Sequence, residues 1–207
     1  MKLRPLHTLR GGDSLAPATS NKAGTLGYFV KKKKAVGILS NCHVMRAVGD
    51  KLLSPAKKYR GPAKKYRGTD NDYIGTVKNI AFTAAVDCGY APLRKKITKF
   101  RLTDGTSVTG TEAASVGTLI KFCGHTSGLV KRGAVQSVDW AGVVGGKQFR
   151  NQILISQPAQ GGDSGSLLVN RENDRAIGLI FADSAAHGLA NQIQDVLAAL
   201  GVQIAIE

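Results

Sequence analysis

One nine-residue stretch, GGDSGSLLV at residues 161–169, places a serine among glycines directly before an apolar segment. Glycines on both sides of Ser164 let the backbone turn sharply and leave room for a bound molecule. Free backbone N–H groups beside this serine can face an oxygen on which negative charge develops. A serine hydroxyl alone is a poor nucleophile, so chemistry at Ser164 needs a base from another part of the chain.

The best candidates for that base, and for an acid to orient it, lie upstream. His43 is near the end of the apolar stretch ILSNCHV, and Asp87 is a lone acid in the small, apolar segment AAVDCG. Asp70 and Asp72 are alternative acids in a more polar, loop-like setting. The order His, Asp, Ser is the one found in chymotrypsin-like enzymes, and it differs from the orders of subtilisins and α/β-hydrolases.

Most of the remaining chain consists of short apolar segments separated by Gly, Asn or Asp, which predicts an all-β fold. Many short strands with closely spaced turns favour a barrel or a sandwich. The segments predicted to be strands are 24–30, 35–40, 51–54, 72–80, 118–123, 129–140, 152–156, 166–169 and 176–182.

One helix is predicted near the C-terminus. Asn191 is a candidate N-cap, Gln194 stands at the third helical position as in a capping box, and Gly201 supplies a stop. The apolar face of this helix consists of Ile193, Val196, Leu197 and Leu200. We expect the helix to pack against the domain and close it.

Together these motifs resemble the trypsin-like serine peptidases of the chymotrypsin double-barrel family, especially compact bacterial-type members without disulfides. SNCHV at 40–44 is similar to the histidine motif of that family, usually T-A-x-H or S-N-x-H, and GGDSGS is similar to its serine motif. Residues 176–182 resemble the strand beside the specificity pocket. GHTSG at 124–128 resembles a turn often written G-R-T-T-G in bacterial members, and AGTLG at 23–27 resembles their first barrel strand.

The resemblance implies two packed six-stranded antiparallel β-barrels with a C-terminal helix. Residues 1–105 would form an N-terminal strand segment and the first barrel, and residues 106–207 the second barrel and the helix. His43 and Asp87 would come from the first barrel and Ser164 from the second, so the resemblance places the cleft at their interface.

The resemblance also implies a serine endopeptidase that works through an acyl-enzyme, with neither cofactor nor metal. Ser164 would attack the scissile carbonyl, and His43 would remove and later return the proton. Asp87 would hold the histidine tautomer, and the backbone N–H groups of Gly162 and Ser164 would form the oxyanion hole. A catalytically silent pseudo-peptidase, or a basic binding module for acidic partners or nucleic acid, is the alternative.

Two departures from the family concern activation and disulfides. No IVGG-like new N-terminus lies near the start of the chain, whereas the zymogen-type members pair that amine with the aspartate before the serine, here Asp163. Asp163 must therefore be positioned in another way. Cys42, Cys88 and Cys123 fit small buried thiols in a reduced compartment, and a redox switch between Cys42 and Cys88 is an alternative.

Substrate preference is only partly indicated. Pro158 occupies the position six before Ser164, where a trypsin carries its specificity aspartate, so a basic-residue pocket of that kind is not supported. Asp183 and His187 are two further candidates for the specificity pocket, with surface-loop residues as the simpler interpretation.

The charge of the chain is unevenly distributed. The protein has 207 residues and a formal net charge of +15; residues 1–105 hold 22 Lys and Arg against 6 Asp and Glu, and residues 106–207 hold 7 against 8. The basic residues gather at 31–34, at 94–101 and at 57–67, where the segment PAKKYRG is repeated in tandem. Such a field attracts acidic polymers or substrates, although a solvated loop surface is the simpler interpretation.

The expected partner is a protein or peptide substrate, of acidic character if the basic half takes part. Nucleic acid is disfavoured because no zinc-finger spacing, helix-turn-helix pattern or aromatic platform accompanies the charge. The chain has no apolar run of about 18 residues that would predict a membrane span. The first residues lack the apolar run of a signal peptide, so we expect a cytoplasmic protein, with secretion by another route left open.

Overall fold

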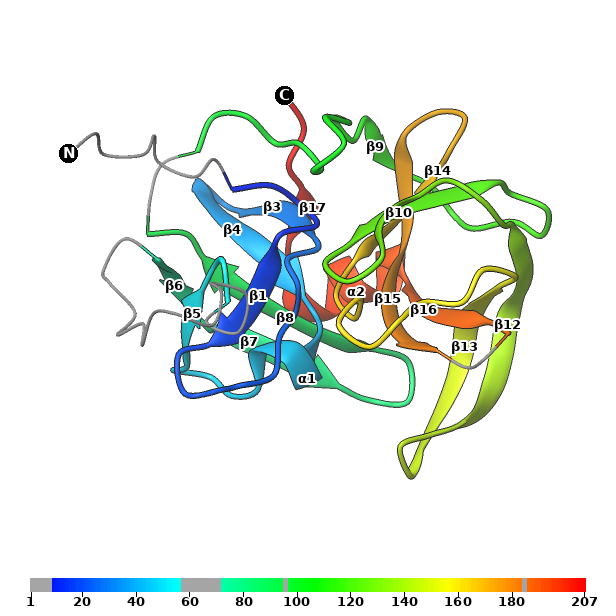
Figure 1. Ribbon diagram of the computed structural model, residues 1–207, viewed down its shortest axis with the longest axis horizontal. Coiled ribbons are helices and arrows are strands. Elements are labelled where there is room, and N and C mark those ends of the chain that lie inside the picture. Colours follow the sequence, from blue (N-terminus) through cyan, green and yellow to red (C-terminus); the bar gives the residue numbers. More distant parts are fainter. Residues whose placement is uncertain (1–8, 57–71, 95–96, 184–185) are drawn as a thin grey trace.

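The computed structural model describes residues 9–56, 72–94, 97–183 and 186–207, which are mostly β-strand (Figure 1). In the first half the elements are β1 (Ser14–Pro17), β2 (Gly24–Thr25), β3 (Tyr28–Lys32), β4 (Ala35–Ser40), α1 (Cys42–Met45), β5 (Lys51–Leu53), β6 (Tyr73–Thr76), β7 (Asn79–Phe82) and β8 (Asp87–Pro92). The second half holds β9 (Gly110–Thr111), β10 (Ile120–Gly124), β11 (Gly128–Val130), β12 (Val135–Val144), β13 (Lys147–Ile155), β14 (Leu167–Asn170), β15 (Arg175–Asp183) and β16 (Gly188–Gln192). The chain ends with α2 (Ile193–Leu200) and β17 (Gln203–Ile204), and the expectation of an all-β chain with a C-terminal helix is confirmed.

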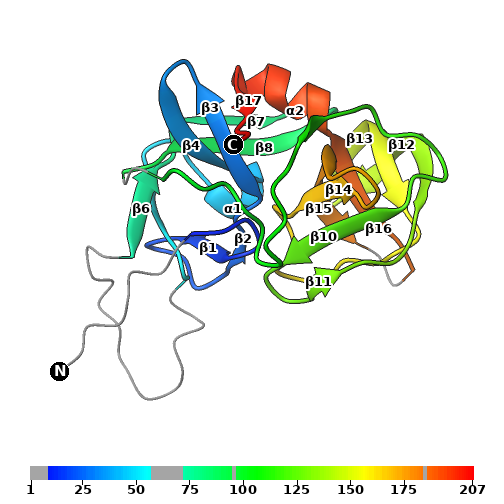
Figure 2. The same ribbon diagram turned by 90° about the horizontal axis from the view of Figure 1, so that it is seen from above.

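The strands form three sheets. Two belong to the first half and have the orders β2-β1-β5-β6 and β17-β3-β4-β8-β7. The third has the order β11-β10-β14-β15-β16-β13-β12, and β9 pairs with β15 in parallel. The other strand pairs of the described ranges are antiparallel, as hairpin-rich barrels require. Figure 2 shows the two halves side by side.

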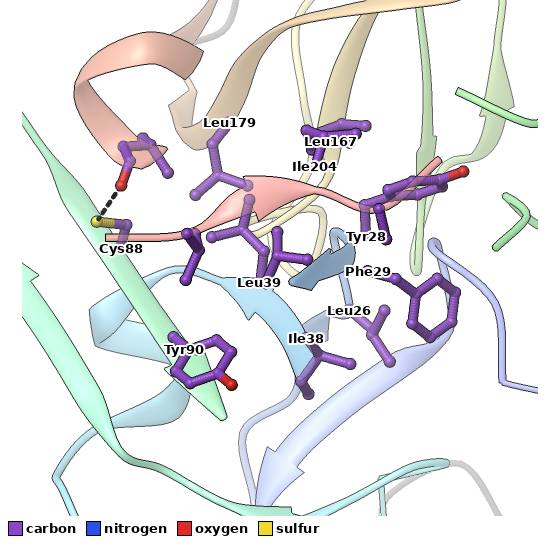
Figure 3. Packing of buried hydrophobic residues seen from close by; sticks show 14 of the residues in the cluster. Leu26, Tyr28, Phe29, Ile38, Leu39, Cys88, Tyr90, Leu167, Leu179 and Ile204 are labelled. Carbon is purple, nitrogen blue, oxygen red and sulfur yellow. Dashed lines mark hydrogen bonds between the residues drawn. The ribbon is translucent and has the colours of Figure 1, made fainter. Parts of the chain in front are cut away.

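Strands β14 and β15 form a wall that both halves share. Because side chains alternate along a strand, Leu167 and Leu179 belong to the apolar cluster of the first half, whereas Leu168 and Ile180 belong to that of the second. Figure 3 shows Leu167 and Leu179 in one cluster with Leu39. Ser164 lies just before β14, so the nucleophile candidate stands where the two halves meet.

The C-terminal segment returns to the first half. Strand β17 pairs with β3, and α2 packs against β7 and β8 as well as against β15 and β16 (Figure 2). Ile193, Val196 and Leu200 are buried in the first half's cluster, and the Cys88 thiol donates to the Val196 carbonyl (Figure 3). That the first barrel ends and the second begins after residue 105 remains a prediction.

The predicted start of the helix is wrong and its predicted end is confirmed. Asn191 belongs to β16, where it is paired with both Leu179 and Gln152, and Gln192 is the N-cap without a side-chain capping bond. Strand pairing on both sides holds Asn191 in the sheet, although asparagine is a favourable residue at a helix N-cap. Gly201 ends the helix in the left-handed conformation at φ 61°. None of the helices in the described ranges is long and apolar enough to cross a membrane.

The basic segments are described only in part. The repeated PAKKYRG unit, from residue 57 onward, lies outside the described residues, and so does Asp70. Within the run 31–34, the Lys32 ammonium donates to the Leu200 carbonyl at 2.8 Å, and the Lys31 ammonium lies 5.5 Å from the centre of the Phe100 ring. Part of this charge therefore packs against the protein itself.

Candidate active site

His43 and Asp87 lie together at one end of the first half. The pairing of β4 with β8 brings the residues that follow β4 next to Asp87, the first residue of β8. His43 Nδ1 is 2.5 Å from Asp87 Oδ2, and the backbone N–H of His43 donates to Asp87 Oδ1 at 3.1 Å. With the carboxylate accepting from Nδ1–H, the outward Nε2 is left as the basic nitrogen.

The two members of this pair differ in exposure. The Asp87 side chain is 3% exposed and that of His43 is 43% exposed. The Asp87 carboxylate is therefore enclosed by protein, while the more exposed His43 ring remains accessible from solvent. Asp72, one of the two alternative acids, directly precedes β6, and its carbonyl accepts from the Ser54 N–H at 3.0 Å.

Ser164 borders the same region from the other half. The Thr25 N–H donates to the Ser164 carbonyl at 2.8 Å. A Cβ placed on Gly24 would collide with Val44, the neighbour of His43, and would lie 2.9 Å from the Ser164 carbonyl. Only glycine at position 24 lets the histidine segment and the serine segment approach this closely.

The Ser164 hydroxyl donates to the Phe181 carbonyl at 3.4 Å. It makes no hydrogen bond to His43 within the described part of the chain. Serine–histidine bonds are often long in ligand-free sites and tighten when a substrate binds. The structure therefore brings the three predicted residues into one region without closing the final bond between hydroxyl and imidazole.

Besides the Gly161 N–H, the loop 160–166 leaves two backbone donors next to the serine without an acceptor among the described residues. The N–H groups of Asp163, Gly165 and Ser166 donate to Gln160, Ile180 and Asp163 carbonyls at 2.8, 2.8 and 2.9 Å. Those of Gly162 and Ser164 have no acceptor among the described residues. Gly162, at φ 108°, adopts a conformation that side chains disfavour. Two unoccupied donors flanking a hydroxyl can bind an oxyanion.

Asp163 is held without an N-terminal amine. Its Oδ1 accepts from the N–H groups of Thr126 and Ser127 at 3.0 and 2.9 Å. Its Oδ2 accepts from the Ser127 hydroxyl at 2.5 Å and from the Gln160 N–H at 2.9 Å. These four donors occupy the roughly four acceptor positions of a carboxylate. The turn at 124–128 thus supplies the other way of positioning Asp163 that the sequence requires.

Thr25 is a residue of the candidate site that sequence reasoning missed. Its hydroxyl donates to the Gly162 carbonyl at 2.8 Å and accepts from the His125 N–H at 2.9 Å. Its own carbonyl accepts from the Ser40 hydroxyl at 2.7 Å. Thr25 therefore ties the serine loop to the first half. The segment AGTLG resembled a barrel strand, but nothing local to it indicated a contact 137 residues away.

The cysteines beside the site are unsuited to act as nucleophiles. Cys42, Cys88 and Cys123 are free and buried. Burial, and then the charge of Asp87, raise the pKa of Cys42, and the same causes raise that of Cys88 to about 12. Both thiols stay protonated near neutral pH, and a thiol is a far weaker nucleophile than a thiolate.

The three specificity candidates come near one another. Asp183 at the end of β15 is paired with Gly188, the neighbour of His187. A Cβ on Gly188 would lie 2.9 Å from the carbonyl of Gln157, the neighbour of Pro158. Asp183 is exposed, and its pKa is raised by partial burial and then by the charge of Asp163. Their part in a pocket remains a prediction.

Comparisons with known proteins agree with the fold. No protein-family model matches the chain, and no curated protein matches it by sequence. Among solved structures, Thermobifida fusca protease A matches with a TM-score of 0.75 at 20% identity, covering 96% of this chain and 98% of that one. A glutamic acid specific serine protease, described as using a histidine triad in substrate binding, matches with a TM-score of 0.75 at 18% identity, covering 95% and 100%.

A third match, Cellulomonas bogoriensis chymotrypsin, has a TM-score of 0.72 at 18% identity, covering 96% of this chain and 98% of that one. The class that these matches define is the chymotrypsin-like double barrel, as found in bacterial serine proteases. This chain has that fold over nearly its whole length, and the predicted resemblance is confirmed at the level of fold. In the described part of the chain, its variant of the fold carries no disulfide.

Proposed function

We propose that the protein is a serine endopeptidase. The observation that carries this proposal is the His43–Asp87 hydrogen bond, set beside a serine whose loop presents the free N–H groups of Gly162 and Ser164. A base with a fixed tautomer and two unoccupied donors are the parts that acyl transfer needs in addition to the nucleophile.

The reaction follows from these positions. The Ser164 oxygen attacks the peptide carbonyl carbon as its proton passes to His43 Nε2, and the oxyanion rests on the Gly162 and Ser164 N–H groups. The C–N bond then breaks, and His43 gives the proton to the leaving amine. Water attacks the acyl-enzyme with the same base, which releases the acid product and restores the Ser164 hydroxyl.

The end of β15 supports a peptide as substrate. β15 pairs with β14 as far as Leu179, and with β16 from Gly178 to Asp183. In the described ranges, residues 181–183 therefore have a strand neighbour on the β16 side only. The other edge lies next to Ser164, whose hydroxyl contacts the Phe181 carbonyl. An extended polypeptide can add to such an edge as a further strand.

A peptide-binding protein without catalysis is the second candidate. The observation that favours it is the Ser164 hydroxyl, which donates to Phe181 and makes no bond to His43 in the described structure. The two candidates differ in one property only. An enzyme must activate Ser164, whereas a binding protein needs only the strand edge.

Reaction with a fluorophosphonate probe separates them. We expect labelling of the wild type, and loss of labelling in Ser164→Ala and in His43→Ala. Ser137→Ala is the matched control, because Ser137 lies on β12 and bonds to Asp139; its labelling should equal that of the wild type. A folded wild type that is not labelled would contradict the enzyme proposal, and a peptide library screened on Ser164→Ala would then test binding alone.

A further inference from the structure

The backbone of Asp87 is held on both sides by buried asparagine side chains. The Asp87 N–H donates to Asn191 Oδ1 at 3.0 Å, and the Asp87 carbonyl accepts from Asn41 Nδ2 at 2.8 Å. Both asparagines are completely buried. Asn41 precedes His43 in the first half, whereas Asn191 lies on β16 of the second half. The candidate acid is therefore fixed partly by the half of the molecule that carries the serine.

Asn191 is itself held by a second amide. Its Nδ2 donates to Gln152 Oε1 at 2.6 Å, and the two residues are directly paired across β13 and β16. Gln152 Nε2 donates to the Ala85 carbonyl at 2.9 Å and to the Arg150 carbonyl at 2.5 Å. The two amides of the second half thus bind the segment 85–87, where β8 begins, at two points, Ala85 and Asp87.

This support matters because the Asp87 side chain has little other support. In the described ranges, its carboxylate accepts hydrogen bonds from His43 alone, from the backbone N–H and from Nδ1. A carboxylate bound by one residue takes its orientation largely from its own backbone. Any shift of that backbone would change the geometry at His43 Nδ1.

We propose that Asn191, supported by Gln152, is a positioning residue for Asp87. The inference rests on the proposed function, since it assigns a purpose to the geometry of the His43–Asp87 pair. Through these two amides the packing of the two halves affects the geometry of the His43–Asp87 pair. Asp87 is held in place when β13 and β16 lie against the segment 85–87. Asn191 serves this role in place of the helix cap that the sequence predicts.

Three variants test the assignment. Asn191→Leu removes the acceptor of the Asp87 N–H and leaves that donor buried without a partner, which is costly. Gln152→Met is milder, because Gln152 does not touch Asp87 and methionine has a similar length. Asn170→Leu is the matched control: Asn170 is a buried amide of the second half that bonds to Glu112 and to the Glu172 N–H, away from Asp87.

The first readout does not require turnover. A proton in a short hydrogen bond is strongly deshielded, so the His43 Nδ1 proton should give a low-field NMR resonance in Ser164→Ala. We expect Asn191→Leu in that background to lose or shift this resonance, Gln152→Met to shift it less, and Asn170→Leu to leave it unchanged. If Asn191→Leu does not fold, the test is the comparison of Gln152→Met with Asn170→Leu: only Gln152→Met should shift the resonance.

The second readout is the split between kcat and KM on a peptide substrate. A displaced acid affects the chemical step, so Asn191→Leu should lower kcat by about 10- to 100-fold and leave KM within a few-fold of the wild type. An unchanged resonance and kcat in folded Asn191→Leu would overturn the assignment, as would equal losses in Asn170→Leu. A wild type that shows the resonance but cleaves no peptide would overturn the proposed function and leave the positioning role intact.

Discussion

Asp87 and Asp163 are both buried carboxylates at the same site, one from each half, yet they are stabilised in opposite ways. Within the described ranges the Asp87 carboxylate accepts from a single residue, His43, whose side chain is 43% exposed. Asp163 accepts from four donors on Thr126, Ser127 and Gln160. The first carboxylate remains available to one partner that changes charge during the proposed reaction, whereas the second is saturated.

The difference follows from the cost of burying a charge. An ionised carboxylate removed from water must be compensated by hydrogen bonds or by an opposite charge. Around Asp163 the compensation is complete and neutral, so the residue pins the loop that presents the Gly162 and Ser164 N–H groups. Around Asp87 it comes from the backbone N–H and the imidazole of His43, so the charge of the acid would act in the proposed reaction. We therefore expect substitutions at Asp87 to affect mainly activity, and substitutions at Asp163 to affect both activity and stability.

Asp87→Asn should give the largest loss of activity. An amide has only one acceptor oxygen: when that oxygen accepts from the His43 backbone N–H, the amide NH2 faces Nδ1 and favours the tautomer with its proton on Nε2, so kcat should fall by about 10⁴-fold. The midpoint of thermal unfolding should change little, because the backbone of residue 87 keeps its hydrogen bonds to Asn41 and Asn191. Steady-state kinetics and a melting curve measure the two effects. A kcat within tenfold of the wild type would contradict the role given to Asp87.

Asp163→Ala should give a smaller loss of activity and a larger loss of stability. The four donors around the carboxylate would be left without an acceptor, so the free energy of unfolding should fall by about 3–5 kcal/mol. The loop would no longer be pinned, and impaired oxyanion binding should lower kcat by about 10²–10³-fold. Denaturant unfolding and kinetics on the folded fraction test both. Equal stability of Asp163→Ala and Asp87→Asn would remove the contrast between the two carboxylates.

The two carboxylates also illustrate which parts of the fold and of the candidate site can be predicted from the sequence. The fold could be predicted because GGDSGSLLV and SNCHV are local motifs, and because short apolar segments separated by Gly, Asn or Asp indicate strands. The stop at Gly201 was likewise local. Asn191 was misassigned because its local pattern fits a capping box, while its real partners, Gln152 and Asp87, are 39 and 104 residues away.

The support of Asp163 shows the same limit. The sequence indicated that Asp163 needs a partner other than an N-terminal amine, and it contained the turn GHTSG. It did not indicate that Ser127 is the residue that donates twice to the carboxylate. A serine in a glycine-containing turn is common, and only the contact of β10 and its turn with the loop 160–164 reveals its purpose.

Ser127→Ala should have a moderate effect on stability and activity, smaller than that of Asp163→Ala. It removes one of the four donors and keeps the Ser127 N–H, so Asp163 stays buried with one acceptor position unfilled. We expect a loss of about 1.5–3 kcal/mol in the free energy of unfolding. The fall in kcat should be smaller than that of Asp163→Ala, with KM nearly unchanged. Ser137→Ala provides the control for removing a serine hydroxyl, and an effect of the same size there would show that the bond to Asp163 is not the cause.

The smallest effect is expected from extending the chain at Met1. In zymogen-type relatives of this fold a new N-terminal amine completes the site by pairing with the aspartate before the serine. Here Thr126, Ser127 and Gln160 already fill the acceptor positions of Asp163, so an ammonium group would have to displace bonds of 2.5 to 3.0 Å to reach it. A tag placed before Met1 should therefore leave kcat and KM unchanged, and so should its removal by a specific protease. If the tagged protein were inactive and gained activity on tag removal, the amine would be needed after all, and the saturation of Asp163 could not explain how the loop is held.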